Sequence, residues 1–126
     1  MRILVSGASG FVGSALVQSL RSDGHEVLSL VRERPDLSKG RVGWDPSAGI
    51  LGIEAIGLLD AVVHLAGAGV AEGRWTPRRK ALIRDSRVKG TKLLAEIFSL
   101  LPDKPKTFIS ASAIGYYGNR ADEILD

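Results

Sequence analysis

The stretch ILVSGASGFVG, residues 3–13, decides the fold of this chain. Its first three residues form a short apolar run, which is typical of a parallel strand buried on both faces. Beyond the first glycines, Val12, Leu16 and Leu20 recur at four-residue spacing, which predicts an amphipathic helix. The glycines therefore lie where a strand turns into a helix.

Gly7, Gly10 and Gly13 in this turn are candidates for binding the pyrophosphate of a dinucleotide. A helix start offers backbone N–H groups without intrahelical acceptors and the positive end of the helix dipole. Glycine suits the position because the turn is tight and a side chain would hold the phosphate away from the backbone. The alternative is an ordinary tight turn, but the flanking strand and helix are the context that nucleotide binding requires. The spacing, G-x-x-G-x-x-G, is one residue longer than the simplest dehydrogenase fingerprint.

The composition is that of one globular domain: 126 residues, of which 44% are hydrophobic and 25% are charged. The absence of cysteine excludes disulfides and thiolate chemistry and is compatible with the reducing cytoplasm, the compartment that we expect. No signal peptide is expected, because the first apolar run is short and glycines follow it. No membrane association is expected either, because Glu54, Asp60 and His64 interrupt the longest apolar stretch, residues 50–70.

The chain carries a formal net charge of +3, and its densest basic segment spans residues 74–92. Within this segment, Lys80, Arg84 and Arg87 fall at i, i+4 and i+7, so one face of a helix would be positive. One interpretation is a solvated helix face supported by pairs of opposite charge. The other is attraction for an anionic cofactor. No binding of nucleic acid is expected, because no aromatic residues alternate with these charges.

Strand and helix patterns alternate along the chain, which predicts an α/β fold with a parallel sheet covered on both faces. We expect a Rossmann-type doubly wound sheet of five parallel strands. The expected strands cover residues 3–5, 25–31, 42–44, 60–65 and 106–110. Thr76 and Pro77 suit the start of a long helix that stops before Pro102. Residues 49–59 are apolar but contain several glycines, and we expect a weak helix or a loop there.

The residues that close the second strand of a dinucleotide-binding unit meet the adenosine ribose. An acidic residue there binds the 2′-hydroxyl and selects NAD, whereas a guanidinium binds a 2′-phosphate and selects NADP. This strand ends in Arg32, Glu33 and Arg34, so both signs are present. NADP(H) is favoured if Arg32 or Arg34 faces the ribose, and NAD(H) if Glu33 does; of the two cofactors we favour NADP(H). A third interpretation is that all three charges are solvated and bind nothing.

Two further segments follow strands at the same expected edge of the sheet. Residues 66–69, AGAG, form a turn of small residues after the fourth strand, and ligands of open α/β sheets bind at such carboxyl ends. The segment after the fifth strand contains Ser112, Tyr116 and Tyr117. The serine could hydrogen-bond a substrate oxygen and a phenol could transfer a proton. The alternative for these residues is turn chemistry and packing.

Four motifs together resemble one known family: VSGASGFVG at residues 5–13, HLAG at 64–67, RWTPRRKALIRDSR at 74–87 and SASAIGYYG at 110–118. They are similar to an atypical branch of the extended short-chain dehydrogenase superfamily. Members are catalogued as NAD-dependent epimerase/dehydratase family proteins and are sometimes labelled cell-division-inhibitor-like. The arginine-rich and tyrosine-containing motifs are the specific ones, because the glycine loop alone indicates only the superfamily.

The resemblance implies roles for the residues that match the family. The implied cofactor-binding residues are Gly7, Ser9, Gly10, Phe11, Val12, Gly13, Val31, Arg32, Leu65, Ala66, Gly67 and Arg87. The glycine loop would hold the pyrophosphate, and Arg32 would meet the adenosine ribose, which favours NADP(H). The residues that follow the fourth strand would line the adenine and nicotinamide-ribose side, and Arg87 would reach the cofactor from the long helix. Ser112 matches the superfamily's catalytic Ser/Thr position. Tyr117 is a second catalytic candidate on the ground of its phenol, and no metal site is expected.

One departure from the superfamily concerns the acid/base. Members carry a Tyr-x-x-x-Lys pair, which is absent from this sequence and in the superfamily lies beyond the position of Asp126. We therefore expect residues 1–126 to be the NAD(P)-binding N-terminal part of a longer domain, without its substrate-binding C-terminal part.

The expected function is binding of NADP(H) as the cofactor part of an epimerase/dehydratase-type oxidoreductase that acts on an unknown small molecule. The chain by itself is expected to be inactive, because it lacks a second lobe to position a substrate and exclude water. The alternative is a non-catalytic dinucleotide-binding regulator that senses redox state. An incomplete sheet would leave apolar surface uncovered, so self-association is expected as well.

Overall fold

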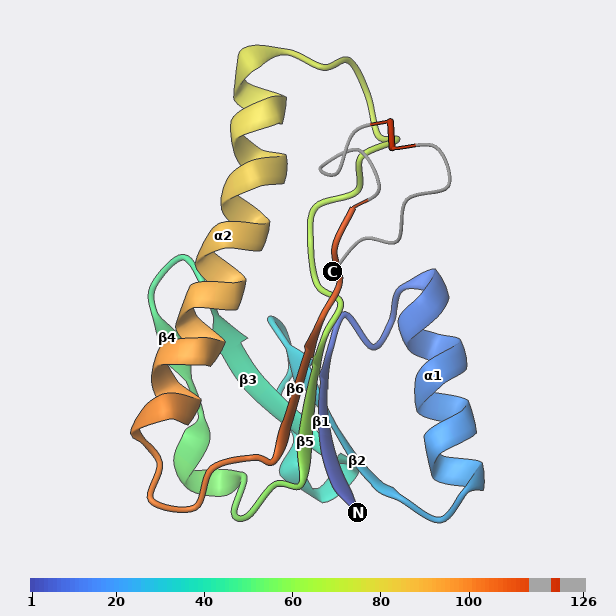
Figure 1. The fold of residues 1–126 in the computed structure, drawn as a ribbon, viewed down its shortest axis with the longest axis vertical. Helices are drawn as coiled ribbons and strands as arrows, with labels where there is room; N and C mark the ends of the chain where they lie inside the picture. Colours follow the sequence, from blue (N-terminus) through green and yellow to red (C-terminus); the bar gives the residue numbers. More distant parts are fainter. Residues whose placement is uncertain (114–118, 121–126) are drawn as a thin grey trace.

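The computed structural model describes residues 1–113, 119 and 120, and within them it forms one six-stranded sheet between two helices (Figure 1). The strands are β1 (Arg2–Ser6), β2 (Glu26–Val31), β3 (Arg41–Asp45), β4 (Ile50–Leu51), β5 (Ala61–His64) and β6 (Thr107–Ser110). The helices are α1 (Phe11–Ser22) and α2 (Pro77–Leu100), with short 3-10 turns η1 (Leu37–Lys39) and η2 (Ile53–Ala55). This arrangement confirms the predicted Rossmann-type α/β fold.

β1 is at the centre of the sheet, whose strand order is β4-β3-β2-β1-β5-β6. It pairs in parallel with β2 on one side and with β5 on the other, and β3 and β6 extend the parallel sheet outward. The direction of winding reverses at β1, because β2 and β3 are added on one side and β5 and β6 on the other. In open α/β sheets, ligands bind at the carboxyl ends of the strands beside such a reversal.

The two faces of the sheet belong to separate hydrophobic cores. The core on the α2 side contains Leu4, Leu28, Leu30, Val42, Trp44, Leu51, Ile56, Leu59, Val62, Leu93, Leu94 and Phe98. The core on the α1 side contains Ile3, Val5, Val17, Val27 and Val63. Successive side chains of a strand point to opposite faces, so Leu4 and Val5 face different helices. The apolar run of β1 is continuous because both of its faces are buried.

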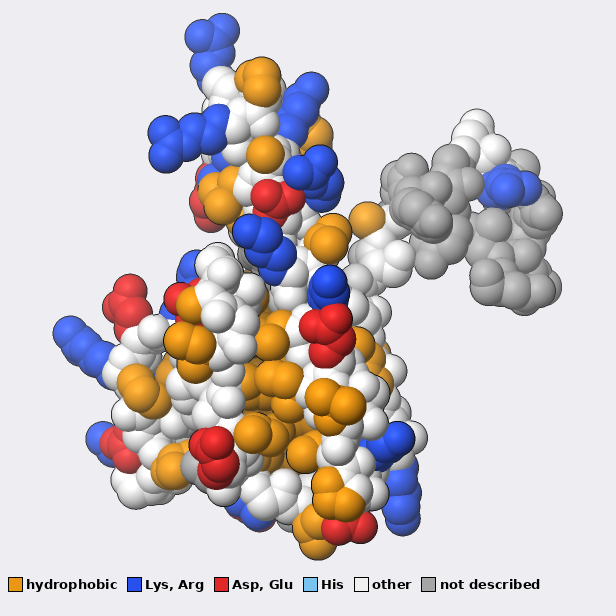
Figure 2. Space-filling view, turned by 90° about the vertical axis from the view of Figure 1, so that its left-hand side faces the viewer, with side chains coloured by type: hydrophobic (Ala, Val, Ile, Leu, Met, Phe, Trp, Pro, Cys, Tyr) orange, Lys and Arg blue, Asp and Glu red, His pale blue; other side chains and the backbone are white. Residues whose placement is uncertain are grey.

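The ends of α2 agree with the predicted signals. Thr76 Oγ1 accepts a hydrogen bond from Arg79 N at 3.2 Å, and Pro77 is the first helical residue. The helix ends at Leu100, before Pro102. Its N-terminal half projects beyond the sheet (Figure 1), and Lys and Arg side chains gather on this projecting part (Figure 2). Neither α2 nor any other helix in the described part of the chain is long and apolar enough to cross a lipid bilayer.

The sheet differs from the five predicted parallel strands at one edge. Residues 49–59, for which we expected a weak helix or a loop, contain β4, which pairs antiparallel with β3. Asp45 Oδ1 accepts hydrogen bonds from Ser47 N (2.8 Å) and Ala48 N (3.2 Å). Together with a φ of +72° at Gly49, these bonds turn the chain back directly after β3. A two-residue strand is too short to leave an alternating pattern, so the sequence did not reveal it.

β6 is at the opposite edge of the sheet. All of its residues are exposed: the exposed fraction is 40% for Phe108 and 52% for Ile109. Among the described residues it pairs with β5 alone, so its outer backbone groups face no neighbouring strand. An apolar, unpaired edge is where another strand adds to a sheet. The predicted self-association therefore has a candidate surface and stays a prediction.

We expect Leu94→Ala to lower the free energy of unfolding by about 2–5 kcal/mol, because Leu94 is fully buried and its truncation leaves a cavity. Leu100→Ala is the matched control on the same helix. Leu100 is 83% exposed, and the change should be within about 0.5 kcal/mol. Urea unfolding followed by circular dichroism measures both values. Equal destabilisation by the two variants would contradict the packing of α2 on the sheet.

Candidate functional site

The carboxyl ends of four parallel strands lie together at one end of the sheet. This end, and not the outer strands β4 and β6, is called the cofactor edge. Ser6, the last residue of β1, is in register with Leu30 in β2 and with His64 in β5. His64 is in turn in register with Ser110, the last residue of β6. The segments that follow these strands therefore share one edge, as predicted. They contain the glycine loop, Val31 and Arg32, Leu65 to Gly67, and Ser112.

Two glycines of the loop are required by close backbone contacts. Gly7 has a φ of +71°, and a Cβ there would lie 2.8 Å from both Ala66 N and Leu65 C. A Cβ on Gly13 would lie 2.1 Å from Gly7 O. Both positions must be glycine for β1, α1 and the end of β5 to pack as they do. Packing alone therefore explains the glycines at positions 7 and 13, without reference to the predicted phosphate binding.

Gly10 differs from the other two glycines because it borders open space. A Cβ there would meet only Gly7 O, at 3.3 Å. Gly10 is the N-cap of α1, no side chain among the described residues caps the helix, and its first turn contains no acidic residue. Ser9 is exposed, as are Phe11 (96%) and Val12 (63%), so the core does not require these side chains. The first-turn N–H groups are thus available to an anion, and the site fits a pyrophosphate.

The end of β2 presents charges of both signs. Val31 is partly buried, whereas Arg32, Glu33 and Arg34 are exposed. Arg41 Nη2 donates a hydrogen bond to Glu33 O at 3.2 Å, which fastens the backbone of this loop. Arg34 has a φ of +50°, an uncommon conformation for a residue other than glycine. Both Arg32 and Glu33 are therefore accessible at the predicted ribose position.

The loop after β5 is fastened to α2. Ser86 Oγ accepts a hydrogen bond from Ala68 N at 2.9 Å. Arg87 Nη1 donates to Ala68 O (3.1 Å) and to Ile83 O (3.0 Å). A Cβ on Gly67 would lie 3.0 Å from Arg87 Cζ, so the guanidinium packs directly against this residue. Arg87 thus lies beside the predicted cofactor edge, and it also holds the backbone of the loop.

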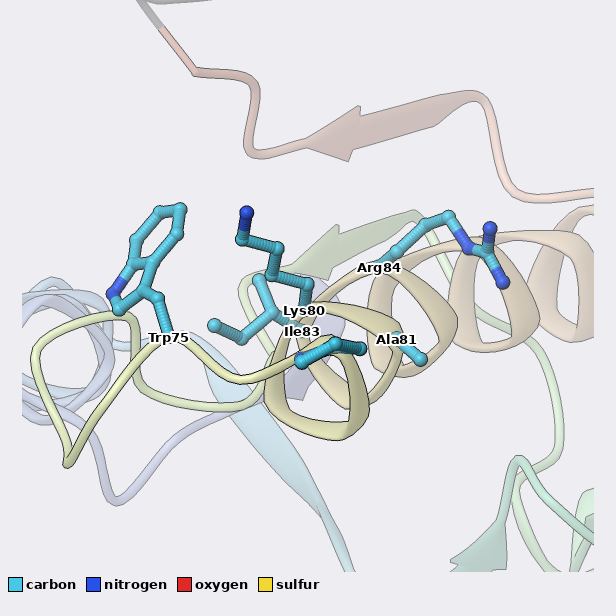
Figure 3. A pocket seen from close by; sticks show the side chains of 6 residues that line it. Trp75, Lys80, Ala81, Ile83 and Arg84 are labelled. Carbon is cyan, nitrogen blue, oxygen red and sulfur yellow. The ribbon is translucent and has the colours of Figure 1, made fainter.

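A hollow of about 530 Å³ lies at the start of α2 and is lined by Trp75, Pro77, Lys80, Ala81, Ile83 and Arg84. Trp75 Nε1 donates a hydrogen bond to Val70 O at 3.0 Å. The Trp75 ring and the Lys80 side chain are directed to the same side (Figure 3). None of the predicted cofactor-binding residues lines this hollow. Lys80 and Arg84 therefore belong to a different surface from Arg87, although the sequence placed all three on one helix face.

Of the two predicted catalytic residues, the structure describes Ser112 but not Tyr117. Ser112 is exposed and lies shortly after β6. Ala111 N donates to His64 O at 3.0 Å, which extends the pairing of β5 with β6 by one residue, and Ser112 follows directly. Tyr117, like Tyr116, lies outside the described residues. Within the residues that are described, no group of three or more His, Asp or Glu side chains could hold a metal ion.

One buried polar pair at this edge is absent from the predicted site. Ser6 and His64 are 0% and 3% exposed, and Ser6 Oγ lies 2.6 Å from His64 Nδ1. Burial lowers the pKa of His64, so its imidazole is neutral at pH 7. The sequence did carry a signal: a serine and a histidine end two apolar strands, where buried polar groups need partners.

We expect the protein to lose stability as the pH falls below about 6.5, the ordinary pKa of histidine. The pKa of His64 is lower in the folded state, so the unfolded chain binds a proton first and unfolding becomes easier. The full contribution of neutral His64 is present above the unfolded pKa and is lost as the pH falls toward the folded one. Urea unfolding at about pH 7.5 and about pH 5.5 measures the effect. His64→Asn should reduce this pH dependence and His25→Asn should retain it, whereas equal pH dependence in His64→Asn and the wild type would contradict the assignment.

Comparison with known proteins gives three related findings. Residues 3–125 match the model of the NAD dependent epimerase/dehydratase family. An epimerase family protein of Mycobacterium leprae is 40% identical over 124 residues, which are 98% of this chain and 39% of that protein. The crystal structure of human epimerase family protein SDR39U1 (isoform 2) with NADPH has a TM-score of 0.78 and 34% identity, and covers 93% of this chain and 38% of that chain.

A third relative is a short-chain dehydrogenase/reductase superfamily protein from Agrobacterium tumefaciens with bound NAD. Its structure has a TM-score of 0.63 and 30% identity, and covers 90% of this chain and 33% of that chain. This chain spans about two fifths of the length of the M. leprae and human proteins. The family match includes the glycine loop and the described ends of β1, β2, β5 and β6. The chain therefore belongs to the NAD dependent epimerase/dehydratase family.

Proposed function

We propose that this chain binds a nicotinamide dinucleotide at the carboxyl ends of β1, β2 and β5, with the pyrophosphate at the start of α1. The observation that carries the proposal is the uncapped helix start at Gly10, which borders open space beside two glycines in close backbone contact. Backbone N–H donors and the positive end of the helix dipole suit phosphate oxygens. The related human and A. tumefaciens structures contain NADPH and NAD, which supports the same class of ligand.

We propose NADP(H) as the preferred form of the cofactor. Arg32 directly follows β2 and is exposed, so its guanidinium could bind a 2′-phosphate in bidentate fashion. The backbone from Leu65 to Gly67 would line the opposite side of the crevice. Arg87 would add positive charge to that side while its Nη1 holds the loop after β5.

The proposed activity of the whole protein is that of an epimerase/dehydratase-type oxidoreductase acting on a small molecule in the cytoplasm. The cofactor would supply hydride transfer when bound. Ser112, at the same edge, would donate a hydrogen bond to a substrate oxygen, and Tyr117 is the candidate proton donor. We propose that turnover requires more than these 126 residues, because the chain spans about two fifths of its relatives.

We expect Gly10→Val to abolish NADPH binding and to leave the fold largely intact. A branched side chain would fill the space in front of the first-turn N–H groups, whereas its Cβ would meet only Gly7 O, at 3.3 Å. Gly13→Ala is the contrasting variant, because its Cβ would lie 2.1 Å from Gly7 O. Unlike Gly10→Val, it should lower the free energy of unfolding in addition to weakening NADPH binding. Isothermal titration with NADPH and urea unfolding measure the two effects. Wild-type NADPH affinity in Gly10→Val would mean that the pyrophosphate binds elsewhere.

Arg32→Ala tests the cofactor preference. A charge-assisted hydrogen bond to a phosphate contributes about 1.5–3 kcal/mol, so NADPH affinity should fall roughly tenfold to a hundredfold and NADH affinity much less. Lys104→Ala is the control for loss of one surface charge, because Lys104 is exposed in the loop before β6, away from the end of β2, and should affect neither cofactor strongly. Titration of both cofactors into both variants gives the four dissociation constants. Equal losses for NADPH and NADH in Arg32→Ala would contradict the preference.

A further inference from the structure

The roles proposed above leave out the buried pair of Ser6 and His64, which lies directly behind the cofactor edge. Histidine is costly at this position, because the side chain is 3% exposed and its Nε2 has no hydrogen-bond partner among the described residues. An aliphatic side chain would avoid that cost at the end of an apolar strand. The histidine must therefore make an interaction that a hydrocarbon side chain cannot make, and its other nitrogen, Nδ1, is the atom available for it.

The hydroxyl of Ser6 determines which nitrogen of His64 carries the hydrogen. Ser6 Oγ accepts hydrogen bonds from Leu65 N and Ala66 N, at 3.2 Å each. A hydroxyl has one hydrogen and two lone pairs, and both lone pairs are used. The hydroxyl hydrogen must therefore be donated to His64 Nδ1, 2.6 Å away. Nδ1 is then an acceptor, and the imidazole hydrogen is on Nε2.

These hydrogen bonds hold the backbone of Leu65 and Ala66, which would form one side of the proposed cofactor site. Ser6 Oγ is the acceptor for Ala66 N, whereas Leu65 N also donates to the backbone oxygen of Ser6 at 3.2 Å. The peptide between Leu65 and Ala66 is the group against which the glycine loop packs, since a Cβ on Gly7 would lie 2.8 Å from Ala66 N. If the Ser6 hydroxyl turned away, this peptide would lose a restraint beside the cofactor.

Packing keeps the imidazole in the orientation that this network needs. A Cβ on Gly90 of α2 would lie 3.1 Å from His64 Cε1 and 3.2 Å from its Nε2. On β3, Trp44 makes a T-shaped contact with the imidazole, with ring centroids 5.9 Å apart. Ser6, Gly90 and Trp44 carry no charge, and burial lowers the pKa of His64, so Nδ1 stays an acceptor at neutral pH.

We propose that His64 is a positioning residue for the dinucleotide: through the hydroxyl of Ser6, it fixes the backbone of Leu65 and Ala66 as one wall of the cofactor crevice. The proposal rests on the proposed dinucleotide binding. His64 acts through Ser6 and is assigned no contact with the cofactor. Gly90 of α2 supports this role, because the absence of a side chain there leaves space for the imidazole of His64.

Amide hydrogen exchange tests the network without any cofactor. In Ser6→Ala, exchange at Ala66 should be roughly tenfold faster, because its acceptor is lost. Leu65 should keep most of its protection through the backbone oxygen of Ser6. His64→Leu should also speed amide exchange at Ala66. His64→Asn should keep it slow, because the asparagine oxygen can accept the Ser6 hydrogen bond in place of Nδ1. Unchanged exchange at Ala66 in Ser6→Ala would overturn the proposal, as would nitrogen NMR shifts showing a protonated Nδ1 in the wild type.

NADPH titration then tests the consequence for binding. Ser6→Ala and His64→Leu should each weaken NADPH roughly tenfold, and His64→Asn should recover most of the affinity. Leu59→Ala is the control for general destabilisation, because Leu59 is buried near the opposite end of β5. It should lower the unfolding midpoint and keep the NADPH affinity. An equal loss of affinity in Leu59→Ala would overturn the positioning role.

The outcomes also separate the two proposals. A wild-type protein that binds no NADPH contradicts the proposed function itself. A wild-type protein that binds NADPH, with Ser6→Ala and His64→Leu binding it equally well, contradicts only the positioning role of His64.

Discussion

The close approach of β1 and β5 at their carboxyl ends is the constraint on which the rest of the structure depends. At Gly7 the two backbones leave no space for a Cβ, and at Gly13 the start of α1 lies equally close to Gly7. These contacts bring the first turn of α1 beside the end of β5, so the helix start at Gly10 lies at the carboxyl ends of the central strands. Two of the three glycines therefore serve packing, and Gly10 is the one for which we propose contact with the pyrophosphate.

Burial within the sheet falls from the centre to the edge, and the site spans this gradient. From Ile3 to Ser6, every residue of β1 is buried, whereas every residue of β6 is exposed. The groups proposed for cofactor binding lie at the ends of β1, β2 and β5, in the central part of the sheet. Ser112, proposed to meet the substrate, follows β6, the outermost parallel strand among the described residues. The proposed cofactor contacts therefore follow inner strands, and the proposed substrate contact follows an outer one.

Much of the fold could be predicted because local rules and tertiary packing agree. The apolar run of β1, the cap at Thr76 and the stop at Pro102 each gave the correct element, since each signal depends on neighbouring residues. β4 could not be found, because two residues carry no periodicity. The contact of Arg87 with Ala68 joins residues far apart in sequence, and no local pattern encodes it. The network of Ser6 and His64 depends on strand register, which becomes known only once β1 and β5 are paired.

The basic segment of α2 gains an explanation from the loop that it holds. Residues 66–69 are alanines and glycines, so the loop has almost no side chains with which to pack itself in place. Polar side chains of α2 bind its backbone instead: Arg79 binds the carbonyl of Gly69 and pairs with Glu72 at 3.1 Å, and Ser86 and Arg87 bind Ala68. Small residues let a ligand approach the backbone closely, but they leave the loop without anchors of its own. The helix supplies those anchors. Two of the arginines in the basic segment, Arg79 and Arg87, therefore bind the loop's own backbone, in addition to any attraction for an anionic partner.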